Sequence, residues 1–245
     1  MPRIFLPLKE PSEKIHITGE RARYITTVLR CREGDEILIF DGKGTSYRTI
    51  INNITKKEVL VELSGVIPCD TESPLDLVLI QGILRGEKMD IVIQKTTELG
   101  VKEIIPAITE RSQIRETRKL SRWRKIAEEA SRQCGRTIVP VIHELIPFND
   151  IFSSASPCSP YFRKYNGLLF WEDRGIKITE VKERLGGCQS LIIAIGPEGG
   201  FTREEVRAAE RRDFIVASLG RRILRAETAA ISAVTMIQFL FGDLG

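Results

Sequence analysis

Apolar positions follow two different periods along this chain, and the change falls near residue 70. Before it, short runs such as RIFLP, KIHIT, EILIFDG and EVLVELSGVI alternate apolar and polar residues, as half-buried strands do. Residues 20–29 fit a helix, because their apolar side chains share one face. Many short strands with a single helix predict a small β-barrel over residues 1–70.

From residue 74 the pattern is that of alternating strands and helices. LDLVLIQGIL is almost continuously apolar, as in a strand covered on both faces, and EKMDIVIQKTTELG has helical spacing and ends in glycine. VKEIIPAIT is typical of the next strand, so the succession predicts a parallel sheet in an α/β domain over residues 74–245. Further helices are expected near 119–134, 178–185 and 203–212, and further strands at TIVPVI, GLLFWED, LIIAIG and FIVASLG.

Composition narrows the class of protein. The chain is 42% hydrophobic and 29% charged, and no apolar run is long enough to cross a bilayer. The first residues lack the pattern of a signal peptide, so a cytoplasmic protein without membrane contact is expected. Five cysteines are an odd number and are widely spaced, and the two histidines are far apart in sequence. These spacings disfavour a zinc site or a disulfide framework, and no metal is expected.

Positive charge is concentrated in one segment. The whole chain has 37 basic and 33 acidic residues, a net charge of +4, whereas residues 111–136 hold nine basic against three acidic residues, a net +6. Concentrated arginine suits a phosphate backbone, because each guanidinium offers a planar fork of donors. A solvated helix with one basic face is the alternative that the same run allows.

A glycine-rich turn follows one predicted strand in the stretch IGPEGGFTREEV. Gly196, Gly199 and Gly200 permit a tight turn at the carboxyl end of a strand, where open parallel sheets bind ligands. Thr202 and the glutamate three residues later have the spacing of a capping box, so a helix should begin there. The stretch matches neither a dinucleotide fingerprint nor a Walker loop, and Glu198 would repel a triphosphate. A turn that faces a neutral base fits better, and a plain structural turn is equally compatible.

In the second motif, LGRRILRAETAAISAV, three arginines precede a predicted helix. Apolar residues then cover nearly every face from Ala229 to Leu240. A helix that is apolar all round must be buried, either inside its own domain or against a second chain. Both alternatives are compatible with the sequence.

These two motifs resemble the RsmE family of 16S ribosomal RNA (uridine-N3)-methyltransferases in the SPOUT superfamily. Three further stretches resemble the same family: VLRCREGDEILIFDG, MDIVIQKTTELGVKEIIPAITERS and RWRKIAEEASRQCGRTIVP. The resemblance extends over essentially the whole chain. It implies a trefoil-knotted methyltransferase domain, an N-terminal PUA-like RNA-binding β-barrel, a homodimer, and S-adenosylmethionine as methyl donor. The implied substrate is N3 of a uridine, the 1498 site, in 16S ribosomal RNA of the small ribosomal subunit. The alternatives are a SPOUT methyltransferase for another RNA position, a non-catalytic RNA-binding assembly factor, and a Rossmann-type enzyme, whose fingerprint is missing.

The resemblance also implies site residues. Arg225 is the first catalytic candidate, because an arginine beside the uridine can stabilise the anion left when N3 loses its proton, and Glu227 is expected to orient it. A structural salt bridge from Arg225 to Glu227 or Glu198 is the alternative, and no residue is singled out as a base. The expected cofactor-binding residues are Leu169, Phe170, Trp171, Glu172, Ile195, Gly196, Pro197, Glu198, Gly199, Gly200, Leu219, Gly220, Ile223, Leu224, Arg225, Thr228 and Ala229. The expected RNA-binding residues are Arg30, Arg32, Arg111, Arg122, Arg124, Arg132 and Arg136.

Overall fold

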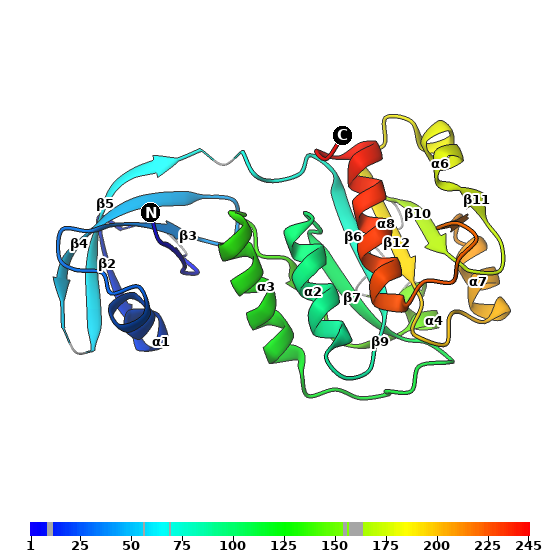
Figure 1. Cartoon of the computed structure of the whole chain (residues 1–245), viewed down its shortest axis with the longest axis horizontal. Coiled ribbons are helices and arrows are strands. Elements are labelled where there is room, and N and C mark those ends of the chain that lie inside the picture. The colour runs from blue at the N-terminus through cyan, green and yellow to red at the C-terminus, as the bar shows by residue number, and fades with distance from the viewer. Residues whose placement is uncertain (9–11, 56, 69, 154–155, 157–163) are drawn as a thin grey trace. The chain divides into compact units, whose positions relative to one another are not determined.

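The computed structural model describes residues 1–8, 12–55, 57–68, 70–153, 156 and 164–245 (Figure 1). It divides the chain into two compact units. The first contains Met1–Glu72 and Ser131–Val139, and the second contains Ser73–Ala130 and Pro140–Gly245. The segment 131–139 therefore packs with the N-terminal unit, whereas the sequence placed it within the domain 74–245.

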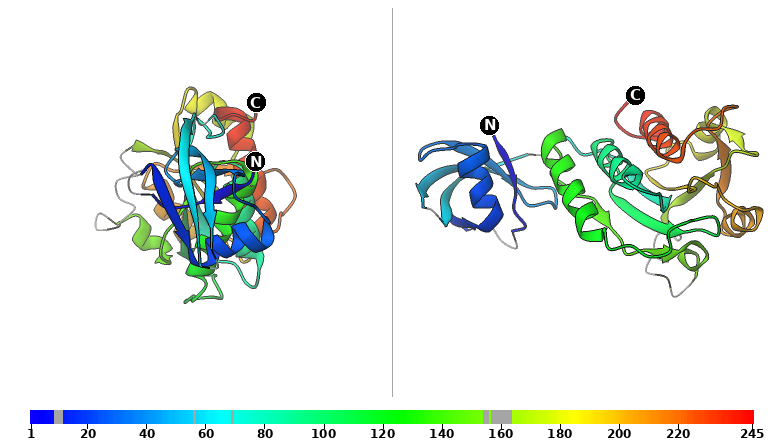
Figure 2. Two further views of the ribbon diagram at one scale, coloured as in Figure 1. Left: turned by 90° about the vertical axis from the view of Figure 1, so that its left-hand side faces the viewer. Right: turned by 60° about the horizontal axis from the view of Figure 1, so that its bottom comes forward.

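The first unit is a curled five-stranded sheet with a helix beside it (Figures 1 and 2). Its strand order is β1-β3-β4-β5-β2, with β1 parallel to β3 and the other neighbours antiparallel. The expected helix is α1 (Gly19–Arg23) continued by a π-helical segment, Tyr24–Val28. Alternating residues of the strands bury a core of isoleucines and valines, as the period of two predicted. The strands are β1 (Arg3–Phe5), β2 (Lys14–Thr18), β3 (Glu36–Phe40), β4 (Ser46–Ile54) and β5 (Glu58–Ile67).

The second unit is built on a parallel sheet, which confirms the predicted α/β class. The strand order is β11-β13-β10-β12-β6-β7-β8, with β9 beside β7, and each of these pairings is parallel. The middle strands β10, β12 and β6 are buried almost throughout, which explains their continuous apolar runs. The strands are β6 (Asp76–Gly82), β7 (Glu103–Ile108), β8 (Val141–Ile142), β9 (Ile146–Pro147), β10 (Asn166–Phe170), β11 (Ile176–Lys177), β12 (Ser190–Ile195) and β13 (Ile215–Ser218).

Helices lie at the positions that the spacing predicted, while one strand is shorter than expected. TIVPVI forms a strand only at β8, because the backbone N–H groups of Thr137 and Ile138 donate to the carboxylate of Glu72 instead of a sheet neighbour. The short helix α4 and the strands β9 and β11 were not predicted. The helices are α2 (Lys88–Glu98), α3 (Leu120–Cys134), α4 (Phe148–Ile151), α6 (Ile178–Leu185), α7 (Arg203–Glu210) and α8 (Ala226–Phe241).

The apolar helix α8 packs beside α2 (Figure 1), and one of its faces is buried in its own unit. Ala230, Ala233 and Ile237 are fully buried, and the buried amide of Gln238 donates to the carbonyl of Leu99. Phe239 on the same helix is 59% exposed. The core alternative thus accounts for one face of α8 and leaves another face uncovered. None of the helices in the described ranges combines the length and the apolar character needed to cross a membrane.

Candidate active site

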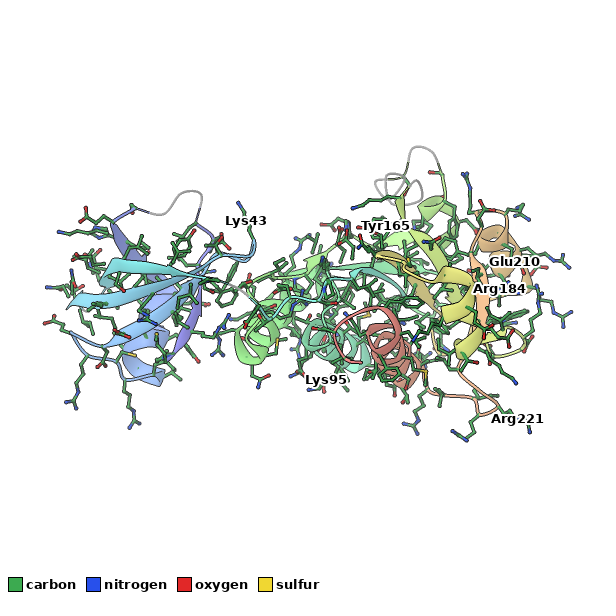
Figure 3. All side chains as sticks on the ribbon, turned by 90° about the horizontal axis from the view of Figure 1, so that it is seen from above. Lys43, Lys95, Tyr165, Arg184, Glu210 and Arg221 are labelled. Atoms are coloured by element: carbon green, nitrogen blue, oxygen red, sulfur yellow. The ribbon has the colours of Figure 1, made fainter. Side chains whose placement is uncertain are left out.

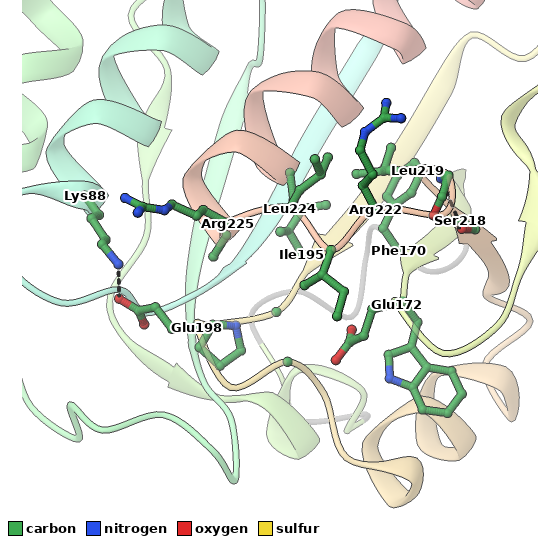
Figure 4. Close-up of a pocket in the computed structure, with 18 residues that line it drawn as sticks. Lys88, Phe170, Glu172, Ile195, Glu198, Ser218, Leu219, Arg222, Leu224 and Arg225 are labelled. Carbon is green, nitrogen blue, oxygen red and sulfur yellow. Dashed lines mark hydrogen bonds and ion pairs between the residues drawn. The ribbon is translucent and has the colours of Figure 1, made fainter.

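A cavity of about 370 Å³ lies at the carboxyl ends of β10, β12 and β13 (Figure 4). Since β10 pairs in parallel with both β12 and β13, the loops that follow the three strands leave the sheet at the same edge. The residues that line it are Lys88, Phe170, Trp171, Glu172, Ile195, Gly196, Pro197, Glu198, Gly200, Ser218, Leu219, Gly220, Arg222, Ile223, Leu224, Arg225, Ala226 and Ala229.

The cavity brings together all but three of the residues expected to bind a cofactor. Leu169 does not line it, because its side chain is fully buried in the hydrophobic core beside β10. Gly199 lies against Arg111, whose Cβ would be 3.0 Å from an added Cβ at the glycine. Thr228 lies on an exposed face of α8. A larger residue at position 199 would therefore press on Arg111 and not on the cavity.

Sequence reasoning missed four lining residues: Lys88, Ser218, Arg222 and Ala226. Ser218 and Ala226 are chain neighbours of predicted residues and Arg222 lies inside the arginine motif, so the motifs carried a signal for these three. Arg221 of the same motif is exposed (Figure 3) and does not line the cavity. Lys88 comes from α2 and gave no local signal, because it lies 110 residues before its partner Glu198.

The turn after β12 has the tight shape that its glycines suggested. The N–H of Gly200 donates to the carbonyl of Pro197 at 2.9 Å, and Gly200 has a φ of +68°, which favours glycine. The buried side chain of Gln81 donates to the carbonyl of Gly196 from behind. Thr202 and Glu205 form the predicted capping box, which starts α7 immediately after the turn.

Two carboxylates have the same cation, Lys88, as a neighbour: Glu198 lines the cavity (Figure 4), and Glu227 lies in the first turn of α8. The Nζ atom of Lys88 lies 3.2 Å from Glu198 Oε1 and 4.0 Å from Glu227 Oε2. Burial alone would raise the pKa of Glu198, but hydrogen bonds from the N–H of Arg85, from its own N–H and from Lys88 outweigh burial and lower that pKa below its usual value. Glu198 is therefore ionised at neutral pH.

Arg225 precedes the first turn of α8 and is exposed. Within the described ranges its guanidinium makes no hydrogen bond or ion pair, so the salt bridge to Glu227 or Glu198 that the sequence allowed is not formed. Glu227 faces Lys88, and its Oε2 atom is buried without a hydrogen-bond donor among the described residues. The structure thus gives Glu227 a different neighbour from the one expected.

The arginines expected to bind RNA differ in their exposure and in their contacts within the protein. Arg30 and Arg32 are exposed in the first unit. The guanidinium of Arg132 lies over the ring of Tyr24 at 4.9 Å. Arg122 pairs with Asp90 at 2.8 Å and Arg124 with Glu144 at 3.2 Å, yet both stay more than half exposed. Arg111 is exposed and donates to the carbonyl of Gly199 at 2.9 Å.

Arg136 is a correction to that set. Its side chain is only 3% exposed, and its Nε and Nη2 atoms donate to Glu72 at 3.1 Å and 2.9 Å. A guanidinium buried against a carboxylate cannot reach a phosphate backbone. Arg136 instead ties the segment 131–139 to the end of the N-terminal unit.

Two family models match this chain, and several known proteins are similar to it. Residues 71–238 match the RNA methyltransferase domain family, and residues 17–64 match the RNA methyltransferase PUA domain family. The ribosomal RNA small subunit methyltransferase E of Buchnera aphidicola is 35% identical over 232 residues, which cover 93% of this chain and 88% of that relative. That of Bacillus subtilis is 29% identical and covers 98% of this chain and 96% of that relative.

Solved structures agree over the full length. A ribosomal RNA small subunit methyltransferase E from Neisseria gonorrhoeae, bound to S-adenosyl methionine, has a TM-score of 0.89 and 32% identity, covering 100% of both chains. A putative methyltransferase from Legionella pneumophila, in complex with the same cofactor, has a TM-score of 0.87 and 32% identity, covering 99% of this chain and 98% of that one. The chain therefore belongs to the RNA methyltransferase family that includes the ribosomal RNA small subunit methyltransferases E.

Proposed function

We propose that this protein transfers a methyl group from S-adenosylmethionine to N3 of a uridine in 16S ribosomal RNA of the small subunit. The observation that carries the proposal is the cavity at the ends of β10, β12 and β13, which gathers residues from both sequence motifs of the family. Its volume lies in the range of small-molecule sites, about 300–1,000 Å³.

The residues of the cavity suit this cofactor. Phe170, Leu219 and Leu224 offer apolar surface for an adenine ring, and the turn at Gly196 and Gly200 presents backbone groups to its edge. When bound, S-adenosylmethionine supplies an activated methyl group on a sulfonium, and the chain supplies position and electrostatics.

Arg225 is proposed as the catalytic group. The acceptor nitrogen must lose a proton, and the resulting negative charge spreads onto the two carbonyl oxygens of the uracil. An unpaired guanidinium at the edge of the cavity can donate to such an oxygen, and this interaction strengthens as the charge develops. The charged neighbour of Glu227 is Lys88, at 4.0 Å.

RNA binding is assigned to five exposed arginines and one half-buried arginine, Arg132. Arg30 and Arg32 in the PUA unit, and Arg111, Arg122, Arg124 and Arg132 in or beside α3, are proposed to contact phosphates. A small ribosomal subunit in the cytoplasm is the proposed setting.

A homodimer is proposed to cover the uncovered face of α8. Phe239 on α8 and Ile91 on the neighbouring α2 are both large, apolar and exposed, at 59% and 43%. Such surface is commonly buried by a second chain.

Single-turnover methylation at saturating cofactor tests the catalytic assignment. Arg225→Ala should lower the rate about a hundredfold, because one donor to a developing oxyanion contributes on that scale, and should change S-adenosylmethionine affinity by less than about threefold. Arg225→Lys keeps the charge but loses the fork and should stay impaired. An Arg225→Ala enzyme that methylates at the wild-type rate would contradict the assignment. A wild-type protein that binds the cofactor and RNA but transfers no methyl group would favour the assembly-factor alternative.

A further inference from the structure

Lys88 lines the cavity but lies outside both sequence motifs that supply most of the other lining residues. It is the first residue of α2, and its Nζ atom lies 3.2 Å from Glu198 and 4.0 Å from Glu227. One ammonium group thus lies near two carboxylates: that of Glu198, in the turn after β12 (Figure 4), and that of Glu227, in the first turn of α8. The three elements meet only in the folded chain.

Both carboxylates would otherwise attract Arg225. Their side chains are only 25% and 16% exposed, and Glu227 Oε2 is buried without a hydrogen-bond donor among the described residues. A buried carboxylate oxygen without a donor is costly, and a guanidinium satisfies it well through its two parallel N–H groups. Figure 4 shows the Arg225 side chain running toward the side of the cavity where Lys88 and Glu198 lie.

We propose that Lys88 is a positioning residue for methyl transfer: its ammonium group hydrogen-bonds Glu198 and places its charge 4.0 Å from Glu227, and it thereby keeps the guanidinium of Arg225 unpaired and available to the uridine. This inference rests on the proposed catalytic role of Arg225. Without the ammonium group, Arg225 pairs with one of the two carboxylates and is withdrawn from the substrate. The turn itself keeps other supports, since Glu198 still accepts from the N–H of Arg85 and Gln81 still holds Gly196.

The test compares variants of the full-length protein in single-turnover methylation of small-subunit RNA at saturating cofactor. Lys88→Met keeps the length of the side chain and removes the charge, and should lower the rate at least tenfold while S-adenosylmethionine affinity changes less than threefold. Lys88→Arg should retain most of the rate. In the triple variant Lys88→Met with Glu198→Gln and Glu227→Gln, neutral amides no longer hold the guanidinium, so the rate should recover at least fivefold over Lys88→Met.

Lys95 supplies a matched control. It lies on the same helix (labelled in Figure 3) and pairs with Glu98 at 2.9 Å, and it is not among the residues that line the cavity. Lys95→Met removes the same charge from α2 and should keep the wild-type rate.

The rates of these variants distinguish the role of Lys88 from that of Arg225. A wild-type rate in Lys88→Met, or a triple variant that stays as slow as Lys88→Met, overturns the role of Lys88 and leaves the proposed function intact as long as Arg225→Ala is impaired. A wild-type rate in Arg225→Ala removes the catalytic assignment itself, and with it the reason to keep that arginine free. Slow Lys88→Met, active Lys88→Arg and a recovered triple variant support the proposal.

Discussion

Replacing Gly82 by alanine is expected to deform the cofactor cavity by displacing the turn at Gly196 and Pro197, which lines it. Gly82 ends β6 and lies directly against the turn after β12. An added Cβ would be 2.5 Å from Pro197 N, 2.6 Å from Pro197 Cδ and 2.8 Å from Gly196 C. These atoms belong to the backbone or to a proline ring, so no side-chain rotation relieves the contact. Because non-bonded carbon atoms rest about 3.5–4.0 Å apart, the Gly196–Pro197 peptide must move by about 1 Å.

The size of the effect follows from that displacement. Inserting a methyl group into a packed site costs about 1–3 kcal/mol of unfolding free energy. The same movement shifts Gly196, Pro197 and Glu198, which line the cavity, so cofactor affinity should also fall about tenfold or more, equivalent to about 1.4 kcal/mol. The loss of affinity should persist under conditions where the variant is fully folded.

Urea unfolding and titration calorimetry with S-adenosylmethionine measure the two effects. Gly65→Ala is the matched control, since Gly65 has no positive φ and an added Cβ there meets no atom within 4 Å. The control should leave affinity unchanged and unfolding free energy within about 0.5 kcal/mol. A folded Gly82→Ala protein with wild-type cofactor affinity would refute the reasoning that this close approach sets the shape of the cavity.

Three further outcomes are expected. Phe239→Asp should shift the light-scattering mass toward the 27.7 kDa of one chain, and a wild-type protein that is already monomeric at micromolar concentration would contradict the dimer. Glu72→Ala removes the hydrogen-bond acceptor of Arg136 and of two backbone N–H groups. Urea unfolding should therefore show that the free energy of unfolding falls by about 3 kcal/mol. A fall of less than about 0.5 kcal/mol would show that the Glu72–Arg136 pair contributes little to stability. Neutralising Arg30 and Arg32 should lower the log–log salt slope of RNA binding by about two, and an unchanged slope would remove both from the interface.

The features that could be predicted from the sequence are those whose residues lie close together along the chain. The turn at Gly196–Gly200 and the capping box at Thr202 lie within a few residues of each other, and the strand periods placed the motif loops at one edge of a parallel sheet. These features were predicted. The trefoil knot implied by the family resemblance stays a prediction.

Long-range partners were out of reach of spacing arguments. Arg136 belongs to a run of arginines that suggests a phosphate-binding surface, but Glu72, 64 residues earlier, buries it. The same holds for Lys88, whose two carboxylates come from the far end of the chain. Charge counts along the sequence do not show which cations are already paired in the fold.

The identity of the methylated nucleoside tests the central claim most directly. Small-subunit RNA lacking the modification is incubated with the protein and S-adenosylmethionine carrying a labelled methyl group, then digested to nucleosides and separated by chromatography with mass detection. The proposed function predicts labelled 3-methyluridine at about one per 16S RNA, and about a hundredfold slower labelling by Arg225→Ala. Label found only on a ribose hydroxyl, on a ring carbon or on a nucleoside other than uridine would contradict it.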